Sequence, residues 1–326
     1  MLVSPVLMSG VDFLFPLVGF FCSHLSPRSV FRFCPWVQGG PVLVVGSRLC
    51  PPPSSDSSSL FVLSLRAEQS SSSREMKCRA EAVSCLSWVL VVGGAVYLWH
   101  QTRSHTEYGR YAPPGSRCCS ARLGWFLQEV PSFLLPLLLQ LLTEEPGGGS
   151  GRTLLLCTFM LHYFHRSFIY AFLTRGRPVP LIIVVSAAIF CSLNGFLQGH
   201  HLLHCTQFEH TWLTDARLAA GFLLFAVGMS INIHSDYILR SLRRPGEVVY
   251  RIPYGGMFEF VSGANFFGEI VEWCGYAVAV WSLPAFAFAF FTICSIGPRA
   301  YQHHRDYLKK FELYPRSRKA IIPFLL

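Results

Sequence analysis

Residues 161–170 read LHYFHRSFIY and place two histidines, an arginine and two tyrosines inside a long apolar stretch. Side chains of these types can move protons, bind anions or hold a metal. The charged and ionisable ones are costly in hydrocarbon, so an apolar segment that carries them needs a buried partner or a wet cavity. We therefore interpret this stretch as part of a functional site.

Other apolar stretches carry polar residues at helical spacing. Residues three or four positions apart lie on one face of a helix. Three sets satisfy this spacing: Asn265, Glu269, Glu272 and Tyr276; Asn232, Asp236, Arg240 and Arg243; and Arg299, His303 and Tyr307. One set alone would be typical of bonding between helices, but three sets favour a large polar cavity. The arginines suit an anionic ligand, because a planar guanidinium group matches phosphate oxygens.

The elements that must position these residues are membrane helices. The chain has 326 residues, of which 14% are charged, against about 25% in a soluble domain. Most of its seven apolar blocks reach the roughly 20 residues that span a bilayer. They cover residues 84–100, 123–142, 153–174, 179–199, 217–235, 261–282 and 284–297. We predict an all-α polytopic membrane protein with seven transmembrane helices. The last two should form a tight hairpin, and the last should continue as helix into the basic tail.

The basic residues predict the orientation. Seventeen lysines and arginines lie in the tail and in the connections after the first, third and fifth blocks, and two lie on the opposite side. Cytosolic connections are rich in these residues, so the C-terminus should be cytosolic. Lys77 and Arg79, before the first block, run against this rule. The net charge is +9. The basic residues that produce it lie between apolar blocks and form no stripe with exposed aromatics, so we expect no nucleic-acid partner.

The first 75 residues differ from the rest. Residues 1–24 are apolar but broken by prolines and a glycine, and no basic residue precedes them, unlike a signal peptide. Residues 51–74 are rich in proline and serine, which is typical of a linker. We predict that residues 1–75 are an extension, disordered or artefactual, and that residues 76–326 are the seven-helix domain.

The cysteines and histidines are the candidate metal ligands of this chain. The 12 cysteines show no paired metal-type spacing, so we expect free buried thiols and no disulfide framework. Histidines cluster at 162 and 165, at 200, 201 and 204, at 234, and at 303 and 304. Membrane di-iron hydroxylases use many histidines, and imidazole suits iron. However, the cluster at 200–204 is predicted to be lumenal and those at 234 and 303–304 cytosolic, so we expect no metal.

A nucleotide-binding loop of the usual kind is missing from the sequence. The glycine-rich stretch EEPGGGSGR at 144–152 is predicted to be lumenal and follows no strand, and neither GxGxxG nor a Walker A motif occurs. A nucleotide would therefore bind between membrane helices and not in a Rossmann domain.

From about Tyr108 to Leu326 the chain resembles the steroid 5-alpha-reductase family, and its type 2 branch most. The matching stretches are FLQEVPSF (126–133), LHYFHRSFIYAFLTRGRP (161–178), NGFLQG (194–199), INIHSDYILRSLRRPGE (231–247), YRIPYGG (250–256), SGANFFGEIVEWCGYA (262–277) and KAIIPFLL (319–326). The resemblance implies an enzyme of the endoplasmic reticulum membrane that reduces the 4,5 double bond of a 3-oxo-4-ene steroid with NADPH. We expect a monomer surrounded by membrane lipids, with helices enclosing a cofactor and steroid cavity.

The resemblance also implies residue roles. Hydride addition to an enone leaves negative charge on the carbonyl oxygen, which a proton donor must stabilise. Tyr163 and Glu129 match the family's positions for this task, while Trp125 and Trp273 would line the steroid slot. The matches for NADPH contacts are Asn232, Asp236, Arg243, Asn265, Glu269, Arg299, His303 and Tyr307, with Tyr170, Arg177, Tyr250 and Arg251 as neighbours. The roles of His162, His165 and Arg166 stay open.

Three alternatives remain from the sequence. The first is a reductase of another enone-like lipid, such as a polyprenol or an enoyl thioester. The second is a membrane methyltransferase of the isoprenylcysteine type, which would not need Glu129 and Tyr163. The third is an inactive lipid-binding relative, against which the filled catalytic positions argue.

Overall fold

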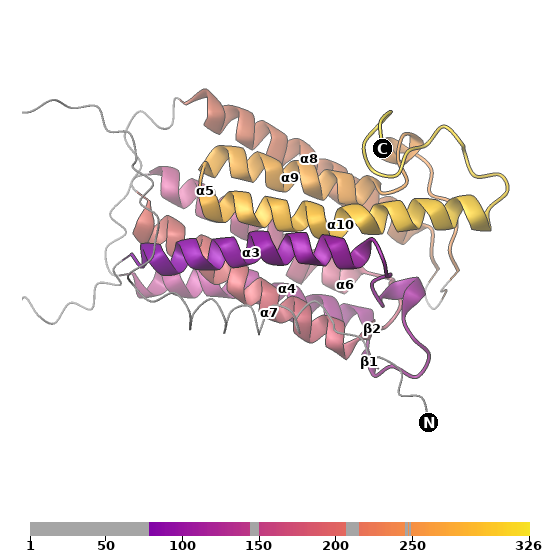
Figure 1. Ribbon diagram of the computed structural model, residues 1–326, viewed down its shortest axis with the longest axis horizontal. Coiled ribbons are helices and arrows are strands. Elements are labelled where there is room, and N and C mark those ends of the chain that lie inside the picture. Colours follow the sequence, from indigo (N-terminus) through magenta and orange to yellow (C-terminus); the bar gives the residue numbers. More distant parts are fainter. Residues whose placement is uncertain (1–77, 144–149, 207–214, 245–246, 248) are drawn as a thin grey trace, which may run out of the picture. The chain divides into compact units, whose positions relative to one another are not determined.

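The computed structural model describes residues 78–143, 150–206, 215–244, 247 and 249–326. The predicted extension at 1–75 and its boundary lie outside this part, as does most of the glycine-rich stretch at 144–152. The described elements are α3 (Ala80–Gln101), η1 (Gly109–Tyr111), β1 (Cys118–Cys119), α4 (Ala121–Leu142), α5 (Ser150–Phe164), η2 (His165–Tyr170), α6 (Ala171–Leu173), β2 (Val179–Pro180), α7 (Leu181–His200), η3 (His201–Cys205), α8 (Ala216–Ser241), η5 (Gly256–Glu259), α9 (Ala264–Val280) and α10 (Leu283–Lys310). The strands β1 and β2 form one short antiparallel pair, and the rest is mainly helical (Figure 1).

The helical polytopic class is confirmed, and each apolar block coincides with a helical segment. Within the described residues, five helices are long and apolar enough to cross a membrane: α3, α4, α7 with η3, α8 and α10. The other two blocks differ for local reasons. The third is interrupted by the π-helical turn η2, and α9 has only 17 residues. The predicted count of seven spans is therefore supported for five.

The predicted hairpin between the last two helices is confirmed. Helix α9 ends at Val280 and is followed by its C-cap residue Trp281, whose φ of 49° is left-handed and turns the chain. The Ser282 hydroxyl then accepts from the Ala285 amide at 3.4 Å and caps α10, which has Pro284 in its first turn. Both features end one helix and begin the next within three residues. Helix α10 continues through Lys310, as the basic tail predicted.

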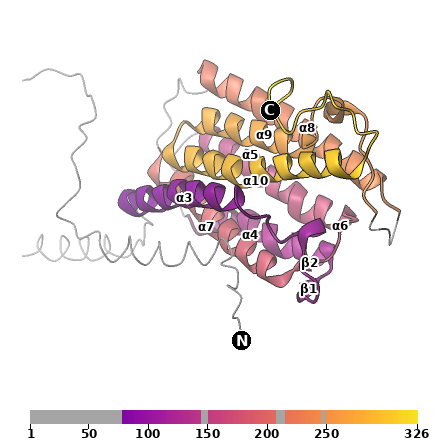
Figure 2. The same ribbon diagram turned by 45° about the vertical axis from the view of Figure 1, so that its right-hand side comes forward.

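Glycines bring α8 and α9 into backbone contact. A Cβ added at Gly228 would lie 2.2 Å from the Glu272 amide nitrogen, and one at Gly268 would lie 2.5 Å from the Asn232 nitrogen. Gly221 and Gly275 repeat this close approach seven residues away on their helices. Small residues at such positions let helix backbones touch in a membrane. The two helices run side by side in Figures 1 and 2, and this contact places their polar faces opposite each other.

Aromatic side chains fill the interior between these helices and α5 and α10. Phe159, Trp273 and Phe288 are almost fully buried, and the Trp273 ring lies 4.4 Å from Phe288 and 5.8 Å from Phe159, measured between centroids. Helix α4 packs separately against α7, where Gly195 and Gly199 admit the backbone around Pro136. Helix α3 packs on α10. The core is therefore built around α9, which carries the predicted polar set.

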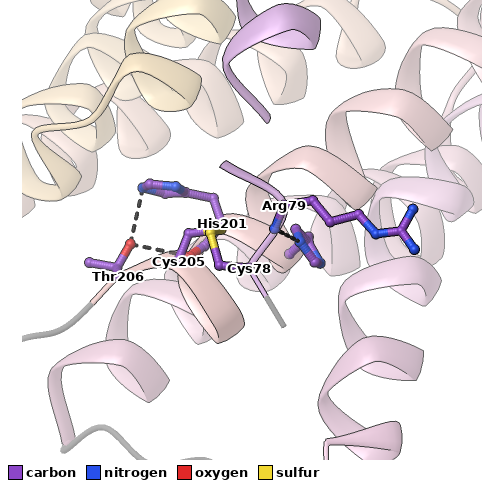
Figure 3. The surroundings of a disulfide bond; sticks show 6 residues. Cys78, Arg79, His201, Cys205 and Thr206 are labelled. Carbon is purple, nitrogen blue, oxygen red and sulfur yellow. Dashed lines mark hydrogen bonds between the residues drawn. A yellow bond between two sulfur atoms is a disulfide. The ribbon is translucent and has the colours of Figure 1, made fainter. Parts of the chain in front are cut away.

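A disulfide corrects the prediction that the cysteines are free. Cys78, just before α3, is bonded to Cys205 at the end of η3 (Figure 3). Around it, the Arg79 amide contacts His200 Nε2 at 3.4 Å, and the Thr206 hydroxyl lies 3.0 Å from His201 Nε2. The two cysteines are 127 residues apart, so no local spacing could have predicted their pairing. Cys191 and Cys294 are free and buried, as expected, whereas Cys157 is exposed.

Candidate functional site

Tyr163 lies at the centre of the aromatic core. It ends the regular part of α5 and is only 3% exposed. Its ring contacts Phe159 and Trp273, with centroids 4.9 Å and 5.8 Å away. Its hydroxyl lies 3.4 Å from Asn194 Nδ2 of α7. The Tyr163 ring is thus packed between the Phe159 and Trp273 rings, and its hydroxyl faces the Asn194 amide.

Glu129 reaches the same region from α4. Its Oε2 lies 3.8 Å from the Cys191 sulfur on α7. The carboxyl is within electrostatic range of Tyr163, and also of Arg166 and His162. The fold therefore brings together the two residues predicted to be catalytic, although they come from different helices 34 positions apart in sequence.

Arg166 is paired with Asp236. It begins the π-helical turn with His165, and its Nη1 donates to Asp236 Oδ2 of α8 at 2.8 Å, with both side chains buried. The guanidinium carbon also lies 4.2 Å from the centroid of the Tyr170 ring and 4.8 Å from that of Trp125. A buried arginine needs such a partner, because an isolated charge is costly to desolvate. In structural terms, Arg166 links the turn η2 to α8 and α4.

His162 is paired with Glu272 in the same way. Its Nδ1 lies 2.6 Å from Glu272 Oε1 of α9, and both side chains are buried. The His162 ring stands edge-on to Trp273, with a centroid separation of 4.5 Å. This histidine pairs with a carboxyl group, as a helix-to-helix contact would, and the described residues contain no cluster of three or more metal-ligating side chains.

The polar sets of α8 and α9 meet face to face. Asn232 Nδ2 donates to the Asn265 carbonyl at 3.0 Å and lies 3.4 Å from Glu269 Oε2. Asp236 also has the Asn265 side chain within hydrogen-bonding range. The glycine contacts described above set this register, because they allow no other separation of the two helices.

The polar set of α10 faces α3 and the segment that follows it. Arg299 Nη2 donates to the Tyr97 hydroxyl at 3.0 Å, and the His303 ring lies 5.7 Å from Phe266. Tyr307 is stacked on Tyr314 at 5.2 Å. Burial raises the pKa of the nearby Tyr108 phenol, while Arg299 acts in the opposite direction. The polar set of α10 thus contacts α3, α9 and the segment after α10, while a single cavity shared by the three sets stays a prediction.

Cations gather around the Tyr250 ring at the ends of these helices. Arg243 lies 5.1 Å from its centroid, and Arg177 and Lys310 each lie 5.5 Å away. Arg251 belongs to the same region, where its Nη1 donates to the Leu242 carbonyl at 2.6 Å. Three positive charges thus lie at one ring, and guanidinium groups are of the type that matches phosphate oxygens.

The structure separates the two tryptophans that were predicted to line one slot. Trp273 lies against Tyr163, whereas Trp125 lies edge-on to Tyr170, 5.0 Å away, and near Tyr108. Their rings therefore belong to two neighbouring groups, one around the predicted catalytic tyrosine and one around the Arg166 ion pair.

Some site residues escaped sequence reasoning. Tyr97 and Tyr108 precede the stretches that carry the motifs, and Lys310 looked like one of many tail cations. Asn194 and Gln198 lie in the matching stretch at 194–199, but their partners Tyr163 and Pro284 come from other helices. Tyr97 carried a usable signal, since it lies with His100 and Gln101 on the last turns of an otherwise mainly apolar helix.

Unpartnered polar atoms remain inside this region. Ser167 Oγ, Ser235 Oγ and Arg299 Nε are buried without a hydrogen-bond partner among the described residues. Buried polar atoms are usually satisfied, so these are positions where a polar ligand could bond. Together with the arginines and the cations around Tyr250, these atoms make up a donor set of the type that fits a ligand with phosphate groups.

Fold and site together describe a polytopic helical membrane protein in which Tyr163 and Glu129 lie in one region with two buried ion pairs. A family model described as 3-oxo-5-alpha-steroid 4-dehydrogenase matches residues 177–326. The chain is 51% identical over 256 residues to 3-oxo-5-alpha-steroid 4-dehydrogenase 2 of Homo sapiens, covering 77% of this chain and 99% of that protein. It is 51% identical over 255 residues to the type 2 protein of Sus scrofa, covering 77% and 99%, and 47% over 246 residues to the type 1 protein of Homo sapiens, covering 74% and 95%.

The chain therefore belongs to the steroid 5-alpha-reductase family.

Proposed function

We propose that this protein is an NADPH-dependent reductase of the 4,5 double bond of 3-oxo-4-ene steroids. The observation that carries the proposal is the 51% identity across 99% of a relative named for this reaction. Tyr163, which is buried, and Glu129 supply the chemistry that the reaction needs. A methyltransferase would not need this pair.

The reaction requires stabilisation of a developing enolate. NADPH, when bound, supplies the hydride that adds to C5 of the steroid. Negative charge then grows on the 3-oxo oxygen, and preorganised donors in a dry site stabilise it strongly. Tyr163 donates a hydrogen bond to that oxygen and keeps its proton, and Glu129, in its neutral form, donates a second hydrogen bond. Solvent completes protonation at C4.

Other residues of this chain bind and orient. Asn232, Asp236, Asn265 and Glu269 offer hydrogen-bonding groups on the facing surfaces of α8 and α9. The region beside these facing surfaces is surrounded by Arg299, His303, Tyr307 and Tyr170. Arg177, Arg243, Arg251 and Tyr250 would hold the phosphate groups, because fixed guanidinium forks favour them. Trp273, buried against Tyr163, presents a flat apolar wall that suits a steroid ring system.

The orientation proposed here has the C-terminus in the cytosol. Cys78 and Cys205 both lie at helix ends that the positive-inside pattern assigns to the lumen. Disulfides persist in oxidising compartments such as the endoplasmic reticulum lumen, so the bond between them supports that assignment. It also offsets the contrary signal from Arg79. The arginine-rich end would then face the cytosolic pool of NADPH.

The test uses membranes that contain the expressed full-length chain. We expect a labelled 3-oxo-4-ene steroid such as testosterone to be converted to its 5α-dihydro product with NADPH, and more slowly with NADH. Membranes from cells with the empty vector provide the control. If the steroid is unchanged while a polyprenol or an enoyl thioester is reduced, the chain is a reductase of a different lipid and the proposal is wrong.

A further inference from the structure

Two buried amide side chains, Gln198 and Asn194, connect the main-chain carbonyl of Pro284 to the hydroxyl of Tyr163 by hydrogen bonds. Pro284 lies in the first turn of α10, and its carbonyl oxygen can only accept a hydrogen bond. Gln198 Nε2 donates to this oxygen at 2.9 Å and also lies 3.2 Å from Asn194 Oδ1. An amide nitrogen carries two protons, so Gln198 can serve both acceptors. The carbonyl therefore decides which end of the Gln198 amide faces Asn194.

The orientation of Asn194 follows from that of Gln198. Because its Oδ1 accepts from Gln198, its Nδ2 is turned toward the Tyr163 hydroxyl, 3.4 Å away. Both amide side chains are fully buried, so bulk water does not compete. Gln198 Oε1 has no partner among the described residues. The Gln198 amide keeps this orientation although its own acceptor oxygen is left unsatisfied. This indicates that the Pro284 carbonyl fixes the direction of the hydrogen bonds from Gln198 to Asn194 and Tyr163.

A second hydroxyl near Tyr163 does not supply the same bond. The Ser132 hydroxyl is also close to the phenol, but it donates its single proton to the Cys191 carbonyl at 2.8 Å. Asn194 is therefore the group that can donate to the phenolic oxygen. An oxygen that accepts from Asn194 directs its own proton elsewhere.

We infer that Asn194 and Gln198 are positioning residues for the reduction. They make the Tyr163 oxygen an acceptor, so that its proton points to the steroid 3-oxo group. The donated bond also stabilises the charge that builds on the phenol as it donates. This inference rests on the proposed role of Tyr163. It identifies Pro284, on a helix outside the catalytic pair, as the anchor that gives these hydrogen bonds their direction.

The test replaces Asn194 with an apolar residue of similar volume. We expect Asn194→Leu to lower kcat for the steroid about 10- to 100-fold, the range for a lost donor to a developing charge, while the Kd of NADPH is unchanged. Gln198→Met should lower kcat in the same direction by less, since Asn194 keeps its amide but loses its fixed orientation. Ser192→Ala is the matched control: its hydroxyl bonds to Ala188 within α7, and turnover should stay at the wild-type rate.

A double-mutant comparison separates positioning from packing. With NADP⁺ bound, Asn194→Leu should weaken binding of the 3-oxo steroid in the wild-type background and have no further effect in the Tyr163→Phe background. Equal weakening in both backgrounds, or wild-type kcat in both the Asn194 and Gln198 variants, would overturn the inference. If Asn194→Leu fails to bind NADPH and so fails to fold, the Gln198 variant alone decides. Full activity of Tyr163→Phe would instead refute the proposed role of Tyr163.

Discussion

The contact between α8 and α9 gives the sharpest stability prediction. In Gly228→Ala the new methyl group would lie 2.2 Å from the Glu272 nitrogen, and 2.6 Å from both the Glu272 Cα and the Gly268 carbonyl oxygen. Non-bonded carbon contacts are comfortable near 3.5 Å, so the first contact is about 1.3 Å too short. All three atoms belong to the backbone, and no rotamer change can relieve the clash. The helices must therefore move apart.

The loss of folding stability in Gly228→Ala follows from the usual effect of overpacking. Insertion of a methyl group into a tight contact costs about 1–3 kcal/mol, and occasionally more. Because the neighbours here are backbone atoms, we expect the upper end, about 3 kcal/mol. For a chain of 326 residues, with an unfolding entropy of about 2.1 cal/mol/K per residue, that lowers Tm by about 4 °C. Separation of the helices should also weaken the Asn232–Asn265 bond and shift Glu272, so the affinity for NADPH should fall as well.

The assay is thermal unfolding of the purified protein in detergent, followed by NADPH titration. Gly297→Ala is the matched control, because a Cβ at this position of α10 meets nothing within 4 Å. It should leave both Tm and NADPH affinity within error of the wild type. A Gly228→Ala protein that melts and binds NADPH as the wild type does would refute the register that we assign to α8 and α9.

Four further predictions follow from the site. Tyr163→Phe should lower steroid turnover at least about 100-fold with NADPH binding retained; turnover near the wild-type rate would remove Tyr163 from the mechanism. Arg243→Ala should raise the KM for NADPH more than the KM for steroid, and an unchanged NADPH KM would place the phosphate elsewhere. Asp236→Ala should destabilise the protein by about 3–5 kcal/mol, because it leaves Arg166 buried and unpaired; a melt without ligand measures this, and an unchanged Tm would mean that the pair is solvated. Cys78→Ser should cost about 2–5 kcal/mol and cancel the effect of reductant on Tm; a wild-type Tm would show that the disulfide does not form.

Much of the fold could be predicted from hydropathy because the membrane imposes simple rules. Apolar runs of sufficient length must be helical, and Ser282 and Pro284 marked the turn between the last two helices. The interruption at residues 165–170 could not be predicted, since a π-helical turn has no composition of its own. The disulfide was missed because its two cysteines are distant in sequence and meet only after α3 and α7 are in place.

The sequence by itself determined the helical polytopic class, the three polar helix faces and, through its resemblance to a family, the candidate pair of Tyr163 and Glu129. These depend on residue types and on spacing along one chain. The tertiary structure alone decided the partners: Arg166 with Asp236, and His162 with Glu272. Helical periodicity states which face a side chain occupies, but the facing helix is set by packing. Here that packing depends on glycines, whose lack of a Cβ lets two backbones touch and brings polar groups on separate helices within bonding distance.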